Sequence, residues 1–128
     1  MKHNKILAII ALSGFLSVMI GAMAAHWLDD IIDEQAIKNI ETALLFQIFH
    51  TLSALIILLL CLQYKNISII IPKLMLFGIL LFSGSIYLLA FSEYIPSFVR
   101  GIAGPVTPVG GILFLVAWGI LLFNSLKK

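Results

Sequence analysis

Residues 43–62 read ALLFQIFHTLSALIILLLCL, and this stretch decides the fold. It carries no charged residue, and about 20 consecutive apolar residues are enough for a helix to cross the ~30 Å hydrocarbon core of a bilayer. Gln47, His50 and Thr51 nevertheless lie inside it, where a polar group stays unsatisfied unless the protein supplies a partner. The stretch predicts a transmembrane helix whose polar side chains are sheltered by neighbouring helices.

The composition of the whole chain is typical of a membrane protein. Its 128 residues are 62% hydrophobic and 11% charged, against about 45–50% and about 25% in soluble domains. No basic patch is interleaved with aromatic side chains, so nothing indicates nucleic-acid binding. The single cysteine, Cys61, lies in an apolar run and excludes a disulfide framework.

Three other apolar runs have lengths close to that of residues 43–62. Because an isolated strand cannot cross lipid with its backbone groups unpaired, we expect each run to be a helix. The sequence therefore predicts an all-α membrane protein, a single four-transmembrane-helix bundle over residues 1–128 whose surroundings are the lipid bilayer. The expected helices are about residues 6–28, 33–63, 72–92 and 106–124.

The first run also has features of a signal peptide. Lys2 and Lys5 precede it, and Ala22-Met23-Ala24 has the form of a cleavage site. Its apolar stretch is longer than the 7–15 residues, roughly, of a usual signal-peptide core. We therefore expect a retained transmembrane helix.

Basic and acidic residues alternate between the segments that flank the runs. The N-terminus, the segment after the second run and the C-terminus carry only basic charges, on Lys2, Lys5, Lys65, Lys73, Lys127 and Lys128. The other two connecting segments carry all the acids, together with Lys38 and Arg100. Because Lys and Arg are enriched on the cytoplasmic side, this alternation predicts that both termini are cytoplasmic.

Two stretches indicate where helices begin. Asp33-Glu34 supplies an acidic first turn, and Ile37 and Ile40 follow at helical spacing, so helix two is expected to start near residue 33. Its first turns would form an amphipathic extension at the outer membrane surface. In the fourth run, Thr107 is expected to be the N-cap, with Pro108 in the first turn, where its missing N–H would be unpaired anyway.

Polar side chains in the outer half of the predicted bundle form the candidate site. Gln47, His50 and Thr51 lie near the middle of helix two and share a face, as do Ser83 and Tyr87 on helix three. We expect these side chains to converge with the start of helix four. The candidate polar or ligand site consists of Gln47, His50, Thr51, Ser83, Tyr87 and Thr107.

His50 has a structural and a functional interpretation. In the structural one, a neutral imidazole bridges helices, donating to a backbone carbonyl and accepting from Tyr87 or Ser83. In the functional one, it belongs to a proton relay or a polar ligand site, because ionisable groups inside membranes are usually functional. The residue pattern alone leaves both open.

The sequence offers little for metal binding or catalysis. The three histidines are too far apart in depth for one ion, so we expect no metal site and no cofactor. No nucleophile elbow, carboxylate pair or phosphate-binding loop is present, so we expect no enzymatic turnover. His26, at the outer end of helix one, is expected to pair with Asp29 or Asp30, or to act as a pH-sensitive contact.

Small residues recur on faces of helices one, three and four, among them Gly21, Gly78 and Gly110. Such residues let helix backbones approach closely in lipid. They are expected to be contacts within the bundle or, alternatively, the seam of a homo-oligomer.

Several motifs, taken in order, resemble one family of small membrane proteins. They are Gly21-Ala22-Met23-Ala24-Ala25-His26, Thr42 with Gln47, His50 and Thr51, Phe82-Ser83-Gly84-Ser85-Ile86-Tyr87, and Thr107-Pro108-Val109-Gly110-Gly111 with Trp118. The chain resembles domain-of-unknown-function family 423, also called uncharacterised protein family 0382, to which the eukaryotic transmembrane protein 256 looks related. It departs from the pattern at Ala24, Ala43 and Phe46. The resemblance implies a four-helix protein of the bacterial inner membrane and transfers no catalytic residues.

These observations lead to one expectation and two alternatives. The expectation is an integral membrane protein whose polar cluster serves binding, interaction or structure. The first alternative is a small transporter or channel component in which His50 carries a proton. The second is an accessory subunit of a larger membrane complex. The expected partners are the lipid bilayer and either further copies of the chain in a homo-oligomer or another membrane protein.

Overall fold

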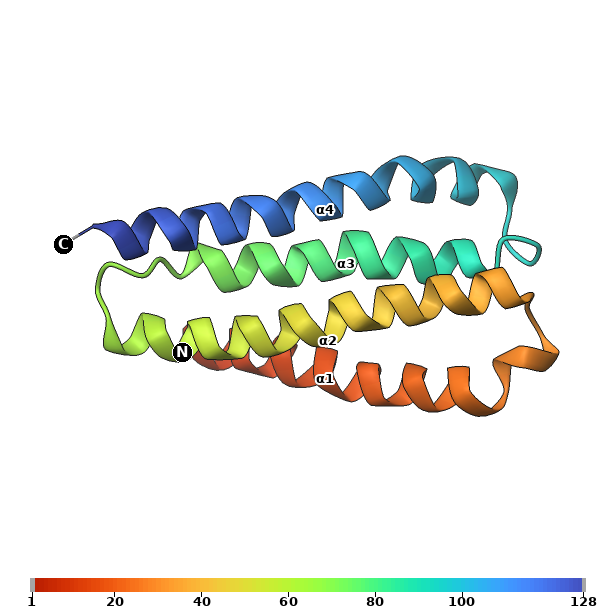
Figure 1. Cartoon of the computed structure of the whole chain (residues 1–128), viewed down its shortest axis with the longest axis horizontal. Coiled ribbons are helices and arrows are strands. Elements are labelled where there is room, and N and C mark those ends of the chain that lie inside the picture. The colour runs from red at the N-terminus through yellow and green to blue at the C-terminus, as the bar shows by residue number, and fades with distance from the viewer. Residues whose placement is uncertain (1, 128) are drawn as a thin grey trace.

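The computed structural model describes residues 2–127, except for the side chains of Lys2 and Asp29. Over these residues the chain forms four α-helices and one short 3-10 turn, without strands. All four helices are long and apolar enough to cross a membrane, which confirms the predicted all-α, four-helix fold (Figure 1). The elements are α1 (Lys2–His26), the 3-10 turn η1 (Leu28–Asp30), α2 (Glu34–Gln63), α3 (Ile70–Ala90) and α4 (Ser97–Leu126).

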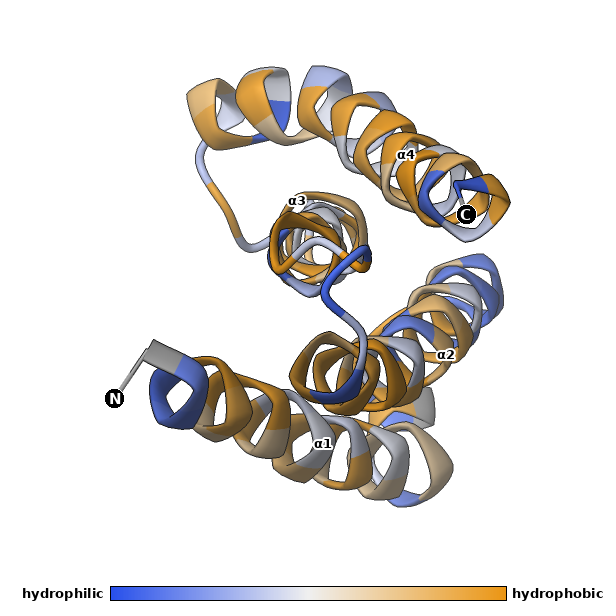
Figure 2. Ribbon diagram, turned by 90° about the vertical axis from the view of Figure 1, so that its left-hand side faces the viewer, coloured by the Kyte–Doolittle hydropathy of each residue, from blue (hydrophilic) through white to orange (hydrophobic). Residues whose placement is uncertain are grey.

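The helices run alternately up and down, so α1 begins and α4 ends at the same end of the bundle (Figure 1). α2 and α3 form its centre, with α1 packed mainly on α2 and α4 packed mainly on α3. Seen end-on, α1 and α4 lie on opposite sides (Figure 2). α1 touches α3 only slightly, and this leaves space between these two helices.

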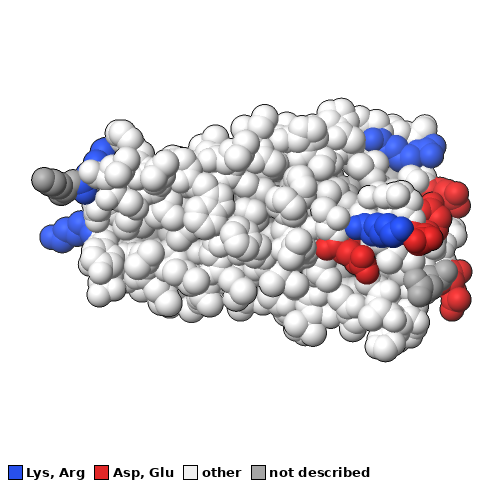
Figure 3. Space-filling model, in the orientation of Figure 1, with Lys and Arg blue, Asp and Glu red and all other residues white. Residues whose placement is uncertain are grey.

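The surface of the bundle suits lipid rather than water. Many large apolar side chains point outward; Val18 is 75% exposed and Leu115 is 74% exposed. Hydrophobic residues surround the helices and hydrophilic ones gather at their ends (Figure 2). On the face in Figure 3 the charged side chains are likewise confined to the two ends. A soluble protein rarely exposes so continuous an apolar surface, whereas a bilayer requires one.

The start of α2 agrees with the sequence prediction. Asp33 is the N-cap, and its carboxylate accepts a hydrogen bond of 2.7 Å from the backbone N–H of Ala36. Ala36 and Ile40 are then buried in a cluster with Leu28 and Ala90, while Lys38 and Asn39 between them are exposed. The first turns of α2 are therefore an amphipathic helical extension, as expected.

The predicted start of the fourth helix is wrong. α4 begins at Ser97, and Pro105, Thr107 and Pro108 all lie inside it, so Thr107 is not an N-cap. A proline ring clashes with the carbonyl four residues earlier, and these positions are Gly101 and Gly104. Glycine gives the backbone enough freedom for such a carbonyl to tilt away, and prolines are tolerated in membrane helices when the freed groups find partners. The Thr107 hydroxyl supplies one such bond, donating to the Ala103 carbonyl at 3.2 Å.

Candidate functional site

A chain of hydrogen bonds centred on Gln47 joins three helices. The Tyr87 hydroxyl of α3 donates to Oε1 of Gln47 at 2.7 Å, and Nε2 of Gln47 donates to the Ser13 carbonyl of α1 at 3.0 Å. The hydroxyls of Ser13 and Thr51 lie 2.7 Å apart and form a second link between α1 and α2. Gln47 is only 3% exposed. The oxygen and the nitrogen of its buried amide both form hydrogen bonds to protein groups, as buried polar groups usually do.

Ser13 belongs to this chain although the sequence prediction omitted it. Ser17, one turn further along α1, donates to the same Ser13 carbonyl at 2.8 Å, and both serines are buried. The signal was present in the sequence, because the two serines are polar residues four apart inside an apolar run. We define the Gln47 chain as Ser13, Gln47, Thr51 and Tyr87.

His50 faces a different neighbour, α4. Its Nδ1 bonds the Phe46 carbonyl at 2.9 Å, which makes Nδ1 the protonated nitrogen because a carbonyl can only accept. Nε2 then accepts from the indole N–H of Trp118 at 3.3 Å. The ring stacks on Phe114 with centroids 3.6 Å apart and planes inclined by 11°. The predicted hydrogen bond from His50 to a backbone carbonyl is confirmed. The prediction that Tyr87 or Ser83 is the second partner of His50 is wrong.

The remaining predicted residues form two further interhelical bonds. Ser83, fully buried on α3, donates to the Ala43 carbonyl of α2 at 2.7 Å. Ser85 and Thr107 join α3 to α4 through hydroxyls 2.6 Å apart. The six candidate residues thus do not converge. Gln47, Thr51 and Tyr87 come together, while His50, Ser83 and Thr107 each bridge a helix pair separately.

All these bonds are internal. Among the described side chains, every buried nitrogen and oxygen has a hydrogen-bond partner. The polar groups are therefore suited to fix the relative positions of the helices, since no hydrophobic force holds helices together in lipid.

His26, at the end of α1, is exposed. Among the described side chains it makes no ion pair with Asp30; the ion pair found there is Lys38–Glu34. The side chain of Asp29 lies outside the described residues, so pairing of His26 with Asp29 stays a prediction.

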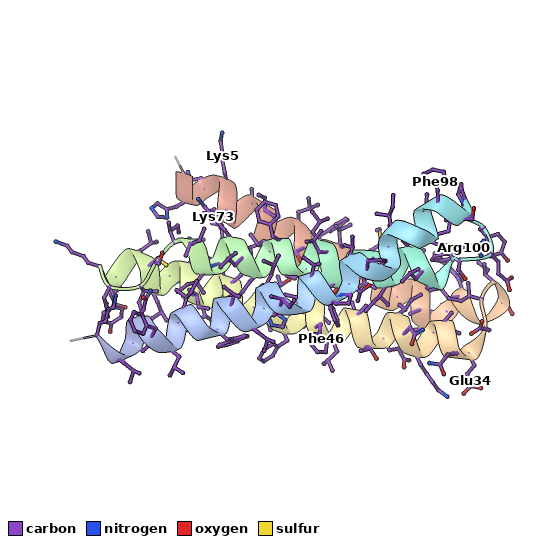
Figure 4. The ribbon with its side chains drawn as sticks, turned by 90° about the horizontal axis from the view of Figure 1, so that it is seen from above. Lys5, Glu34, Phe46, Lys73, Phe98 and Arg100 are labelled. Atoms are coloured by element: carbon purple, nitrogen blue, oxygen red, sulfur yellow. The ribbon has the colours of Figure 1, made fainter. Side chains whose placement is uncertain are left out.

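An apolar groove, which sequence reasoning missed, runs between α1 and α3. Its volume is about 570 Å³. The walls are mostly apolar side chains of α1 and α3, and the polar residues Ser13 of α1 and Gln47 of α2 also line it. Lys73 also lines the groove, at the end of the bundle where α1 begins, and Lys5 lies at the same end (Figure 4). The groove is lined by Ile6, Ile9, Leu12, Ser13, Leu16, Gln47, Lys73, Leu76, Phe77, Ile79 and Leu80.

Replacing His50 with phenylalanine tests whether its ring face or its nitrogens matter. Phenylalanine keeps the stack on Phe114 and loses the bond to Trp118, and interhelical hydrogen bonds in membranes contribute about 0.6 kcal/mol on average. We expect the free energy of unfolding in detergent to fall by less than about 1 kcal/mol. A loss above about 2 kcal/mol would show that the ring nitrogens, and not the stack, hold α2 to α4.

The fold and these contacts define an integral membrane protein of four spans that is tied together by internal polar bonds. The family described as "Protein of unknown function (DUF423)" matches residues 20–111. A "UPF0382 membrane protein" of Haemophilus influenzae is 41% identical over 98% of this chain and 96% of its own length. The chain therefore belongs to this family, and the resemblance of its motifs is confirmed.

Relatives in other bacteria have similar descriptions and match this chain over most of their length. The "UPF0382 inner membrane protein YgdD" of Escherichia coli K12 is 37% identical over 99% of this chain and 93% of its own length. A "UPF0382 membrane protein" of Staphylococcus epidermidis is 36% identical, with 91% of each chain covered. No solved structure matches the chain.

Proposed function

We propose that this protein is a non-enzymatic binding protein of the bacterial inner membrane, and that the α1–α3 groove takes the hydrocarbon part of a membrane amphiphile. The observation that carries this proposal is the groove itself. Its volume of about 570 Å³ falls within the ~300–1,000 Å³ of usual ligand pockets, and its walls are apolar. Its lining includes one buried polar pair, Gln47 and Ser13, which are joined by a hydrogen bond.

The length of the groove supports a single lipid chain. On α1 the lining residues extend from Ile6 to Leu16, which is about 15 Å at 1.5 Å per residue. A bilayer core is ~30 Å thick, so one leaflet contributes about 15 Å. The groove thus spans about one leaflet, from the lysine-bearing end to the middle of the bundle.

The Gln47 chain supports a groove that exists before its ligand arrives. Ser13 and Gln47 tie α1 to α2, and Tyr87 ties α2 to α3, so α1 reaches α3 through α2. Direct contact between α1 and α3 is slight. Lipid supplies no hydrophobic force that would close the gap, so the polar links set its width.

The charge pattern supports an orientation in which the end of the bundle where α1 begins and α4 ends is cytoplasmic. The end where α1 begins and α4 ends carries Lys5, Lys73 and Lys127, and every acid lies in the segments of the opposite end. With the positive-inside rule, both termini are then in the cytoplasm and the groove opens into the inner leaflet.

Transport through His50 is less well supported. Both ring nitrogens have partners inside the protein, one ring face is covered by Phe114, and the residue is 4% exposed. His50 is also not among the residues that line the groove. A role as accessory subunit stays a prediction.

Filling the groove tests the proposal. Leu12 lines it on α1, and Leu12→Trp should occupy its volume; Leu115→Trp places the same bulk on α4, outside the groove. The protein is purified from membranes in mild detergent, and its retained lipid is counted by native mass spectrometry. We expect Leu12→Trp to lose the retained lipid and Leu115→Trp to keep it, with equal thermal unfolding temperatures. Equal retention by both variants, or no lipid on the unaltered protein, would contradict the proposal.

A further inference from the structure

We infer that the occupant of the α1–α3 groove is an anionic phospholipid whose phosphate is held by Lys73, with Lys5 beside it. This inference rests on the proposed function and adds the chemical class of the ligand. The groove accounts for the acyl chain, and the lysines account for the headgroup.

The two lysines stand where a headgroup would be. Lys73 is itself a lining residue, in the first turn of α3. Lys5 directly precedes Ile6, which lines the opposite wall. Both project from the same end of the bundle, whereas Glu34 and Arg100 lie at the other end (Figure 4). A phosphate between them would place its acyl chain along the groove toward Gln47.

Among the described residues, no acidic side chain forms an ion pair with these lysines. All six Asp and Glu residues belong to segments at the opposite end, from Asp29 to Glu41 and at Glu93. Of the side chains that the structure describes, the one ion pair is Lys38–Glu34, also at that opposite end. Lysine binds phosphate as a point charge, and its flexible stem can follow apolar surface while its ammonium group reaches the headgroup region. An anionic ligand would therefore balance the positive charge of the lysines at this end of the bundle.

Headgroup charge decides which lipid is favoured. A zwitterionic lipid brings its own cation to the lysines, whereas an anionic lipid such as phosphatidylglycerol brings only the phosphate charge. Each basic residue near an anionic membrane surface contributes to the binding free energy of an anionic lipid. Two such residues together favour the anionic lipid over the zwitterionic one by about 10–30-fold.

A second copy of the chain fits the groove less well. Copies inserted with the same topology would bring Lys5 and Lys73 of both chains to one level of the membrane. Like charges that face each other across an interface oppose association. The lipid neutralises this end, and a second copy would double its charge.

The test compares two lipids with identical acyl chains. The full-length protein in detergent is exposed to equal amounts of phosphatidylglycerol and phosphatidylcholine, and bound lipid is counted by native mass spectrometry. We expect the unaltered protein to retain about 10–30 times more phosphatidylglycerol, and the double variant Lys5→Gln/Lys73→Gln to bind both lipids equally. The control Lys65→Gln/Lys127→Gln removes two lysines of the same end that do not line the groove, and it should keep the preference.

The other outcomes separate the inference from the proposed function. Equal binding of both lipids to the unaltered protein would overturn the inference and leave the groove as a lipid site. A preference that survives Lys5→Gln/Lys73→Gln would also overturn it. Binding of neither lipid would overturn both, as would a lipid-free dimer cross-linked through the groove.

Discussion

Replacing Gln47 with leucine is expected to loosen α1 and to lower the free energy of unfolding by about 1–3 kcal/mol, the usual effect of leaving a buried polar partner unsatisfied. The Tyr87 hydroxyl loses its acceptor, and α1 loses the amide that bonds the Ser13 carbonyl. The measurement is thermal or denaturant unfolding in detergent. Because Gln47 also lines the groove, retained lipid should fall with stability.

A matched control exists on the same helix. Gln35 bonds Asn39 on the exposed surface, so Gln35→Leu should change stability by less than about 0.5 kcal/mol. Tyr87→Phe removes the other half of the bond, and its effect should not add to that of Gln47→Leu. Additive effects of the two substitutions would show that this bond does not couple α2 to α3.

Adding one methyl group at Gly110 is expected to destabilise the bundle by about 1–3 kcal/mol, the typical penalty of overpacking. A Cβ there would overlap the backbone of Phe82 on α3, and a backbone cannot move aside as a flexible side chain can. α3 and α4 would have to separate, which also disturbs the bond between Ser85 and Thr107. Unfolding of Gly110→Ala in detergent measures the effect.

Gly119→Ala provides the comparison for this substitution. Gly119 lies on the same helix, and a Cβ there would meet no atom within 4 Å, so the substitution should leave stability unchanged or raise it slightly. Equal losses at both positions would show that the close approach of α3 and α4 at Gly110 is not responsible, and helix propensity cannot explain a loss because alanine favours the helix more than glycine does.

The number, type and rough position of the helices could be predicted from the sequence. An apolar run of about 20 residues must be helical in lipid, so residues 43–62 and the other apolar runs could be predicted only as helices. Asp33 indicated the start of α2 because its carboxylate can cap free backbone N–H groups, and in the structure it accepts a hydrogen bond from the N–H of Ala36. These features depend on local chemistry alone.

What could not be predicted depends on how the helices are rotated and spaced. Successive residues of a helix are about 100° apart, so His50 and Thr51 differ by that angle and face α4 and α1 respectively. Treating residues 47–51 as one face therefore merged two separate contacts. The α1–α3 groove has no sequence signal, because it arises from two helices that touch only slightly.

The start of α4 was missed for a local reason. The prediction placed Thr107 at the N-cap and Pro108 in the first turn. However, Gly101 and Gly104 stand four residues before Pro105 and Pro108, where each proline ring would otherwise clash with a carbonyl. This spacing of glycines and prolines is a signal that a continuous helix is feasible, and it can be recognised in the sequence.

The most direct test of the central claim is an NMR measurement of contacts between lipid acyl protons and isoleucine methyl groups, with the protein in nanodiscs of phosphatidylglycerol. Ile79 lines the groove yet is only 7% exposed, whereas Ile57, which is 3% exposed, belongs to the buried core and does not line the groove. A chain in the groove predicts acyl contacts at Ile79 and none at Ile57. The absence of acyl contacts at both methyl groups, or contacts at Ile79 from a second copy of the protein, would contradict the account.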